Sequence, residues 1–407
     1  MTNNSFEIII YGATSFVGQI LCRYLVEELK DPGLNWAMAG RNEAKILQLK
    51  QELGEAGENI QHFIASSEDE ESLRRLCDKS AVIISTVGPY ALYGENLVKV
   101  CAQSGTDYCD LAGEPQWIRR MIEKYHDDAR ASGARIVNCC GFDSIPSDLG
   151  VYFLQQQAKQ RHGQYCPQVK MRVKGFSGGA SGGTIASMVN LYKELTANPE
   201  LRKELTDPYS LCPPGHTFQA KQQNVEMEYD KELQSWTAPF IMAAINTRVV
   251  LRTNALLEPS YNKNFLYDEA MLTGNEPDSK RKAKRAAMGM KLMVPMMAIR
   301  PLRWLALKFM PKPGEGPSLE KQTTGYYDLL FLGVSSNGEQ LRVSVTGDRD
   351  PGYGSTAKML AQAGICLARD ISHDSVKGGF WTPATAMGQA LIERLVKYSG
   401  MTFEAES

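Results

Sequence analysis

The chain has 407 residues, of which 43% are hydrophobic and 22% charged, with a formal net charge of −1. This length favours two domains over one hydrophobic core, and so small a net charge gives no field that would attract nucleic acid. Nine cysteines without Cys-x-x-Cys or Cys/His ligand spacing indicate a reducing compartment and no structural metal. The start lacks the features of a secretory signal, and no uncharged apolar run reaches the ~18 residues of a spanning helix, so a cytoplasmic protein is expected.

The first 148 residues alternate between short apolar runs and helical patterns. Strands are expected at residues 6–11, 36–39, 61–65, 81–87, 107–111 and 135–139, and helices at 16–29, 43–53, 97–104 and 117–132. Strands that alternate with helices predict a parallel, doubly wound sheet. We therefore predict an α/β fold with a Rossmann-type domain over residues 1–148.

The pattern changes after Asp148, which is expected to cap the helix that follows it. Residues 169–176 alternate like a strand, and the alternating runs 326–335 and 340–346 flank Asn337-Gly338, a hairpin pattern. These features predict an α+β second domain, with a mostly antiparallel sheet, over residues 149–378. Residues 379–407 contain a helical pattern that is expected to pack back on the first domain.

A glycine-containing turn, Gly12-Ala-Thr-Ser-Phe-Val-Gly18, follows the first predicted strand. Gly12 permits the tight turn, and Gly18 lets the next helix approach the strand closely. Backbone amides at the helix start can face a pyrophosphate at its positive end. The alternative is an ordinary structural turn. The cofactor-binding residues expected here are Gly12, Thr14, Ser15, Phe16, Val17 and Gly18.

The end of the second strand predicts which nicotinamide cofactor binds. An NAD site needs an acidic residue there to accept from the ribose 2′-hydroxyl, whereas the sequence reads Met38-Ala-Gly-Arg41-Asn42. Arg41, with Lys45 one helical turn later, can bind a 2′-phosphate. We therefore predict NADP(H); a solvated arginine in a loop is the alternative. The turn after the fourth strand, with residues Ser85, Thr86, Val87 and Gly88, should lie beneath the ribose or nicotinamide. The alternative is an ordinary Gly-Pro exit from the strand.

Candidates for the chemistry follow the other strands at the same sheet edge. Asp143 and Ser144 could orient a substrate or relay a proton, and for Asp143 a turn or capping role is the alternative. Tyr90 could donate a proton to an enolate, although buried tyrosines beside a Gly-Pro turn are more often packing residues. The residues expected to line the substrate cleft are Tyr93, Asp110 and Glu114. The carboxylates of Asp110 and Glu114 could instead stabilise their loop by accepting hydrogen bonds from backbone amides.

Several motifs along nearly the whole chain can be compared with a known family. The most specific is Cys140-Gly-Phe-Asp-Ser-Ile-Pro-Ser-Asp-Leu-Gly150, and the others lie at residues 12–18, 39–42, 86–94, 105–114, 181–184 and 382–388. Together they resemble the saccharopine dehydrogenase-like oxidoreductases, including trans-acting enoyl reductases. The resemblance implies an NADP-dependent reductase, with lipid-linked or polyketide-linked substrates in some members. It does not imply saccharopine as the substrate.

Three hypotheses about function follow. The first is an NADP(H)-dependent reductase acting by hydride transfer on a small-molecule or carrier-bound acyl substrate. The second is a non-catalytic NADP-binding scaffold or sensor, and the third is a saccharopine-type amino-acid dehydrogenase. The sequence does not decide whether the chain forms a homo-oligomer.

The segment between Lys280 and Lys312 has an unusual composition. It holds ten Lys or Arg, no acidic residue, and six methionines. A basic amphipathic helix can lie on an anionic membrane surface, and methionines adapt to acyl chains. The alternative is a helix that packs on its own domain. Peripheral attachment to the inner face of a membrane is therefore one of two interpretations.

Overall fold

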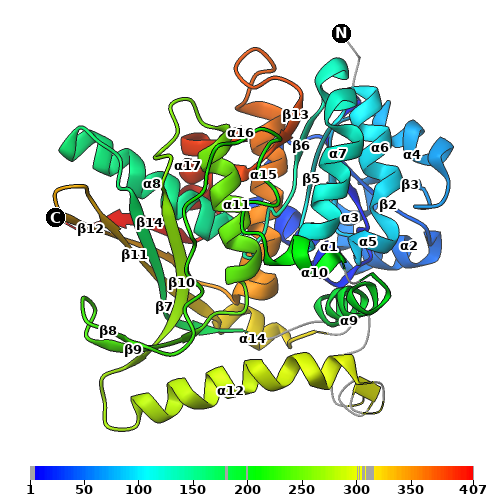
Figure 1. Ribbon diagram of the computed structural model, residues 1–407. Helices are drawn as coiled ribbons and strands as arrows, with labels where there is room; N and C mark the ends of the chain where they lie inside the picture. The colour runs from blue at the N-terminus through cyan, green and yellow to red at the C-terminus, as the bar shows by residue number, and fades with distance from the viewer. Residues whose placement is uncertain are drawn as a thin grey trace.

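The computed structural model describes residues 5–178, 182–198, 200–299, 301, 303–304, 308 and 316–406. Within these ranges the chain forms two seven-stranded sheets. Figure 1 shows the sheets side by side with helices between and around them. No described helix is long and apolar enough to cross a membrane.

The first sheet is entirely parallel. Its strand order is β13-β6-β5-β4-β1-β2-β3, and each adjacent pair runs in the same direction. This order is that of a Rossmann fold, which confirms the predicted doubly wound sheet. The strands are β1 (Phe6–Tyr11), β2 (Trp36–Gly40), β3 (Gln61–Ile64), β4 (Ser80–Ser85), β5 (Asp107–Asp110), β6 (Arg135–Val137) and β13 (Gly379–Trp381).

The second sheet has the order β14-β12-β11-β7-β10-β9-β8. Only β7 and β10 pair in parallel, and the other described pairs are antiparallel. The predicted antiparallel character and the hairpin around Asn337-Gly338 are confirmed. The strands are β7 (Gln168–Ser177), β8 (Tyr229–Asp230), β9 (Ser235–Pro239), β10 (Leu266–Gly274), β11 (Tyr326–Val334), β12 (Gln340–Gly347) and β14 (Met401–Ala405).

Successive side chains of β1 enter two different cores, as the alternation of a strand requires. Ile8 and Ile10 pack into the core beneath α1 (Phe16–Arg23) and α15 (Thr356–Arg369). Ile9 packs into the core beneath α6 (Glu95–Ser104) and α7 (Pro115–Ser132). Figure 1 shows α15 between the two sheets. The helices of the first half are α1 (Phe16–Arg23), η1 (Tyr24–Leu29), α2 (Glu43–Glu52), α3 (Gly54–Glu58), α4 (Glu70–Cys77), α5 (Tyr90–Tyr93), α6 (Glu95–Ser104), α7 (Pro115–Ser132) and α8 (Ile145–His162).

The hydrophobic core beneath α15 continues from the first sheet into the second. It includes Val82 of β4 and Phe331 of β11. The division of the chain at residues 148 and 378 stays a prediction. The remaining described helices are α9 (Gly182–Ala197), α10 (Glu200–Thr206), α11 (Ala243–Leu256), α12 (Ser279–Ala298), α14 (Leu319–Thr324), η2 (Pro351–Ser355), α15 (Thr356–Arg369), α16 (Pro383–Ala386) and α17 (Gly388–Tyr398).

The expected capping role of Asp148 is wrong for the helix that follows it. Asp148 lies inside the first turn of α8, because the helix already begins at Ile145 and Ser144 occupies the N-cap position. Its buried carboxylate instead accepts hydrogen bonds from the Thr253 hydroxyl at 2.5 Å and from the Ala384 amide at 2.8 Å. Asp148 therefore joins α8 to α11 and α16.

Candidate functional site

The turn after β1 has the backbone that a dinucleotide loop needs. Gly12 has φ of 90°, which favours glycine. The Ser15 hydroxyl caps α1 by accepting from the Gly18 amide at 2.9 Å. A Cβ on Gly18 would lie 2.2 Å from the Gly12 carbonyl oxygen, so Gly18 allows the helix to approach the turn.

Three backbone amides at this turn have no hydrogen-bond partner among the described residues. Those of Thr14, Phe16 and Val17 make no hydrogen bond within the described ranges. They lie at the amino-terminal end of α1, where the unpaired amides and the helix dipole favour an anion. This part of the predicted site is suited to a pyrophosphate.

The turns after β1 and β4 are tied together. The Ser15 hydroxyl donates to Thr86 Oγ1 at 2.8 Å, and the Thr86 hydroxyl donates to the Gly12 carbonyl oxygen at 2.9 Å. A Cβ on Gly12 would lie 2.7 Å from both Thr86 Oγ1 and Val87 Cγ2. Ser85 is buried at the end of β4, and Gly88 is exposed. The structure thus brings the predicted residues of both turns into one site.

The end of β2 carries two cations that have no acidic partner in the described part of the chain. Arg41 and Lys45 are exposed, and neither forms an ion pair in the described part of the chain. The carboxylate of Glu43, the nearest acidic residue in the sequence, lies 3.7 Å from Nε2 of His62. Asn42, and not a carboxylate, caps α2 by accepting from the Lys45 amide at 3.0 Å. Both cations are free to contact a 2′-phosphate.

Asp143 differs from the other candidate acids because it has no partner among the residues that the structure describes. It follows β6 and is half-buried, and its carboxylate makes no hydrogen bond or ion pair within the described residues. A Cβ on the exposed Gly113, after β5, would lie 3.2 Å from Asp143 Oδ2. Burial raises the pKa of Asp143 to about 6. A carboxyl group that is partly protonated near neutral pH therefore stands at the carboxyl edge of the first sheet.

Ser144 points into a buried polar network. Its hydroxyl donates to Asn246 Oδ1 at 3.0 Å, and the Asn246 amide donates to Ser147 Oγ and to Glu269 Oε2, each at 3.0 Å. Ser144 is fully buried. The network joins α8 to α11 and β10, so these contacts support a structural role. The catalytic assignment of Ser144 stays a prediction.

The hydroxyl of Tyr90 is engaged by backbone on both sides. It donates to the Ser85 carbonyl oxygen at 3.0 Å and accepts from the Leu111 amide at 3.1 Å, and its ring packs on Trp117 at 5.5 Å between centroids. Burial raises the pKa of Tyr90 well above its usual range. Proton donation to a substrate would require the hydrogen bond to Ser85 to break. These contacts favour the packing alternative, and the catalytic assignment stays a prediction.

Asp110 holds the loops after β5 and β6 together. Its two carboxylate oxygens accept hydrogen bonds from the Tyr108 hydroxyl at 2.9 Å, the Asn138 amide at 2.8 Å, and the backbone amides of Ala112 and Cys139 at 2.9 and 3.2 Å. The side chain is fully buried, and burial raises its pKa to about 6. These contacts correspond to the loop-holding alternative for Asp110.

Glu114 also binds backbone amides, as its alternative role predicts. Its carboxylate accepts from the amides of Tyr90 at 2.9 Å and Ala91 at 3.1 Å, at the start of α5, and from the Ser187 hydroxyl of α9 at 3.0 Å. Burial raises its pKa. Tyr93 lies on the same short helix and is 38% exposed. Of the three predicted cleft residues, Tyr93 alone presents a large surface.

Helix η2 reaches the dinucleotide turn from the second half of the chain, a contact that the sequence pattern did not predict. The Tyr353 ring packs edge-on against Phe16 at 5.1 Å between centroids, and its hydroxyl lies 3.3 Å from Thr184 Oγ1 of α9. Asp350 fixes this turn by accepting from the Tyr353 amide at 2.8 Å. The run Asp350-Pro-Gly-Tyr-Gly is turn-rich, but nothing in it indicates its distant contact.

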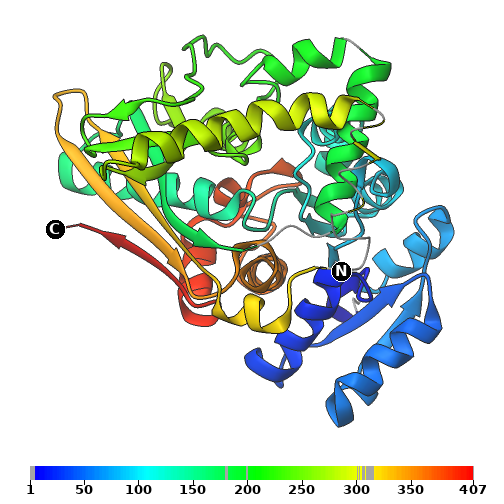
Figure 2. The ribbon, with the colours of Figure 1, turned by 90° about the horizontal axis from the view of Figure 1, so that it is seen from below.

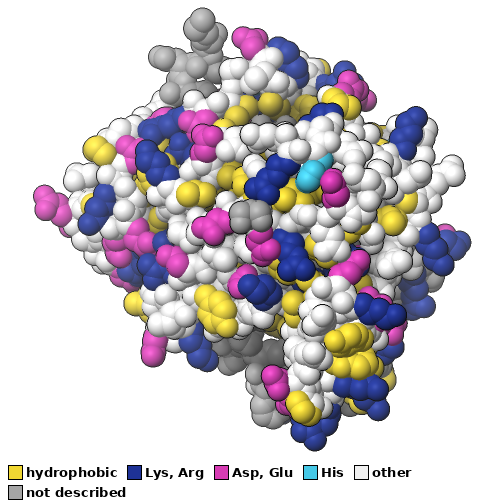
Figure 3. All heavy atoms as spheres, turned by 90° about the vertical axis from the view of Figure 1, so that its left-hand side faces the viewer, with side chains coloured by type: hydrophobic (Ala, Val, Ile, Leu, Met, Phe, Trp, Pro, Cys, Tyr) yellow, Lys and Arg dark blue, Asp and Glu magenta, His cyan; other side chains and the backbone are white. Residues whose placement is uncertain are grey.

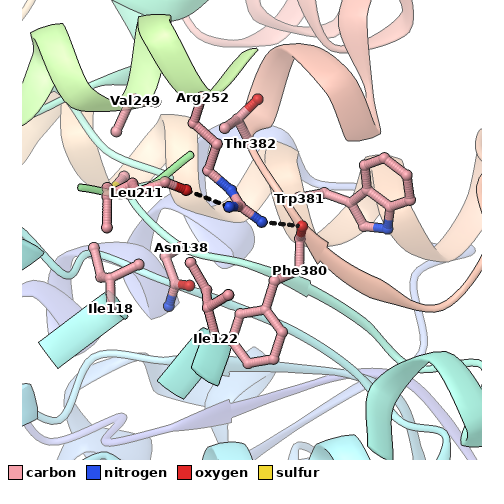
Figure 4. A pocket seen from close by; sticks show the side chains of 10 residues that line it. Ile118, Ile122, Asn138, Leu211, Val249, Arg252, Phe380, Trp381 and Thr382 are labelled. Atoms are coloured by element: carbon pink, nitrogen blue, oxygen red, sulfur yellow. Dashed lines mark hydrogen bonds between the residues drawn. The ribbon is translucent and has the colours of Figure 1, made fainter. Parts of the chain in front are cut away.

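A narrow pocket lies beside β6 and β13 (Figure 4). Arg252 of α11 points into it and donates to the carbonyl oxygens of Leu211 and Phe380. Burial lowers the pKa of Arg252 to about 10. The space at its centre, about 10 Å³, suits at most one water molecule. This pocket belongs to the packing of α11 and is no substrate site.

Comparisons with known proteins bear on this site. Residues 8–137 match the family described as the saccharopine dehydrogenase NADP binding domain. A candidate trans-acting enoyl reductase from Mycobacterium tuberculosis is 38% identical over 97% of this chain and 96% of that protein. The chain belongs to the saccharopine dehydrogenase-like family. A trans-acting enoyl reductase from Mycobacterium ulcerans is 34% identical over 96% of this chain and 95% of that protein.

Solved structures share the fold of this saccharopine dehydrogenase-like protein. Saccharopine dehydrogenase (L-Glu forming) from Saccharomyces cerevisiae aligns with a TM-score of 0.54 at 13% identity, over 98% of this chain and 99% of that one. Homospermidine synthase from Legionella pneumophila, in complex with NAD, aligns with a TM-score of 0.54 at 11% identity, over 99% of this chain and 91% of that one. The family match contains all predicted cofactor-binding residues, which therefore lie within a domain of a family described as NADP binding.

Proposed function

We propose that this protein is an NADP(H)-dependent reductase acting on the carbon–carbon double bond of an enoyl substrate. The observation that carries the proposal is the pairing of a nucleotide turn with a half-buried acid, Asp143, at the same sheet edge; this acid has no partner among the described residues. Relatives named trans-acting enoyl reductase support the reaction class. The family resemblance of the sequence adds a preference for a lipid-like, acyl-linked or polyketide-linked chain, which a separate carrier would present.

The cofactor fits residues that are free in the structure. The unpaired amides of Thr14, Phe16 and Val17 would hold the pyrophosphate. Arg41 and Lys45 would contact the 2′-phosphate through charge-assisted hydrogen bonds, which favours NADP(H) over NAD(H). When bound, NADPH supplies a hydride to the β-carbon of the enoyl group.

Asp143 is the group that we assign to the proton. Reduction of the double bond adds a hydride at the β-carbon and a proton at the α-carbon. An acid must therefore lie near the α-carbon. The pKa of Asp143, about 6 because of burial, keeps a useful fraction of the carboxyl protonated near neutral pH. After the transfer, its carboxylate recovers a proton from water, which reaches it beside the exposed Gly113.

The test is NADPH oxidation in the presence of the pantetheine thioester of a 2-enoyl chain. Asp143→Asn should lower kcat by about 10²- to 10⁴-fold, the usual contribution of a general acid, and leave NADPH affinity unchanged. Because the protonated carboxyl is required, kcat of the unmodified protein should fall as the pH rises through about 6. Asp78→Asn, at an exposed position, is the matched control. Full activity of Asp143→Asn would refute the role of Asp143, and no turnover of any enoyl thioester by the unmodified protein would refute the reaction.

A further inference from the structure

Helix α12 presents large apolar side chains to solvent. Ala283 and Ala287 are buried on its inner side, where the helix packs against β9 and β10. Met288 is 53% exposed and Leu292 is 61% exposed. Figures 1 and 2 show α12 lying lengthwise across one face of the molecule. Because the small inner residues already provide the packing, the outer apolar residues are not needed to cover the core.

Cations share the outward side of α12. Arg281, Arg285, Met288 and Leu292 follow one another at intervals of four, three and four residues, which places them on one side of a helix. Arg281, Lys284 and Arg285 are exposed and form no ion pair within the described residues. In contrast, Lys282 pairs with Asp278 at 3.0 Å.

Exposed apolar side chains continue beyond the helix. Ile299 is 48% exposed and Trp304 is 62% exposed, and the Lys308 ammonium lies 3.7 Å from the Trp304 ring centroid. Figure 3 shows Lys and Arg gathered with hydrophobic side chains at the bottom of the molecule, where Figure 1 places α12. Met293 and Met310 of the basic segment have side chains outside the described part, and Met296 is half-buried.

We infer that this surface docks on an anionic lipid bilayer. We call it the α12 surface, and its described residues are Arg281, Lys284, Arg285, Met288, Leu292, Ile299, Trp304 and Lys308. Unpaired cations are attracted to anionic headgroups, and large apolar residues between them can enter the acyl boundary. Tryptophan is enriched at that depth of a membrane. An acidic carrier protein would match the charge of the cations, but it would not explain why the large apolar residues of the α12 surface are exposed between them.

Helix α12 contacts α9, whose Thr184 Oγ1 lies 3.3 Å from the hydroxyl of Tyr353, and the Tyr353 ring packs on Phe16 at the dinucleotide turn. The described chain resumes at Gly316, whose Cβ position would lie 2.3 Å from the Phe16 ring. Phe16 is the first residue of α1, beside the amides assigned to the pyrophosphate. Docking through the α12 surface would therefore place on the bilayer a helix that direct contacts link to the nucleotide turn. The inference does not rest on the proposed reaction, because it concerns binding to lipid alone.

Vesicle co-sedimentation at low salt tests the inference. The probes are phosphatidylcholine vesicles with and without phosphatidylglycerol. The unmodified protein should bind only the anionic vesicles and dissociate in high salt. Charge reversal by Arg281→Glu, Lys284→Glu and Arg285→Glu should lower the partition coefficient by about tenfold or more, and Met288→Ser with Leu292→Ser should lower it with the charges kept.

The matched control reverses three exposed lysines elsewhere, by Lys79→Glu, Lys263→Glu and Lys397→Glu. It should bind like the unmodified protein, and all variants should keep NADPH affinity, which separates this test from that of the cofactor site. Absence of binding to anionic vesicles would overturn the inference. So would a loss of vesicle binding in the control as large as that in the α12 charge-reversal variant. Binding to an acidic acyl carrier protein through these residues, without binding to vesicles, would also overturn it.

Discussion

Replacing Gly12 with alanine tests the dinucleotide turn at its tightest point. A non-glycine residue at positive φ costs ~1–2 kcal/mol, and φ at Gly12 is 90°. The new Cβ would lie 2.7 Å from Thr86 Oγ1 and Val87 Cγ2, and relieving such an overlap costs ~1–3 kcal/mol more. Thr86 and Val87 would have to shift, and the turn after β4 would shift with them. Gly12→Ala should therefore lower the free energy of unfolding by ~2–5 kcal/mol. It should also weaken NADPH binding.

Gly133→Ala separates strain from steric overlap. Gly133 has φ of 91° and no atom within 4 Å of its Cβ position, so its replacement should cost only the ~1–2 kcal/mol of the backbone. Urea unfolding gives both stabilities, and titration calorimetry gives both NADPH affinities. We expect normal NADPH affinity in Gly133→Ala and at least about a tenfold loss in Gly12→Ala, which corresponds to ~1.4 kcal/mol. Equal stability losses, together with unchanged NADPH affinity in both variants, would refute the argument.

Two further substitutions test single contacts. Tyr90→Phe leaves the Ser85 carbonyl and the Leu111 amide without their partner. Chemical unfolding should therefore show a loss of ~1–3 kcal/mol of unfolding free energy, while kcat stays nearly unchanged. A fall in kcat of about 10²-fold or more would instead make Tyr90 the proton donor. Arg41→Ala should weaken NADPH binding by ~1.5–3 kcal/mol and leave NADH binding unchanged. The control is Arg74→Ala, because Arg74 is exposed on α4. An equal effect of Arg41→Ala on both nucleotides would count against a 2′-phosphate contact.

The parts of the fold that local sequence determines could be predicted. Alternation of strands and helices identified the parallel sheet, and the spacing from Gly12 to Gly18 identified its first turn. At the end of β2, the lack of a carboxylate and the presence of Arg41 are visible in the sequence. These features depend on backbone geometry and residue type within a short segment, and they do not require knowledge of distant contacts.

The contacts that decide between alternatives are long-range and could not be predicted. Asp110 and Glu114 carry the same charge as Asp143, yet both are bound by backbone amides and Asp143 is not. Burial of Tyr90 between the ends of β4 and β5 follows from how these strands pair. Likewise, Tyr353 reaches Phe16 only because α15 folds back on the first sheet. Sequence patterns contain no information of this kind.

The most direct test of the account is titration calorimetry of the unmodified protein with NADPH and with NADH. The two nucleotides differ only in the 2′-phosphate, which Arg41 and Lys45 are placed to contact without a competing carboxylate. We expect NADPH to bind about 10-fold or more tightly than NADH, as one or more charge-assisted hydrogen bonds would give. Equal affinity for the two nucleotides, or tighter binding of NADH, would contradict the assignment of the end of β2 as a 2′-phosphate site.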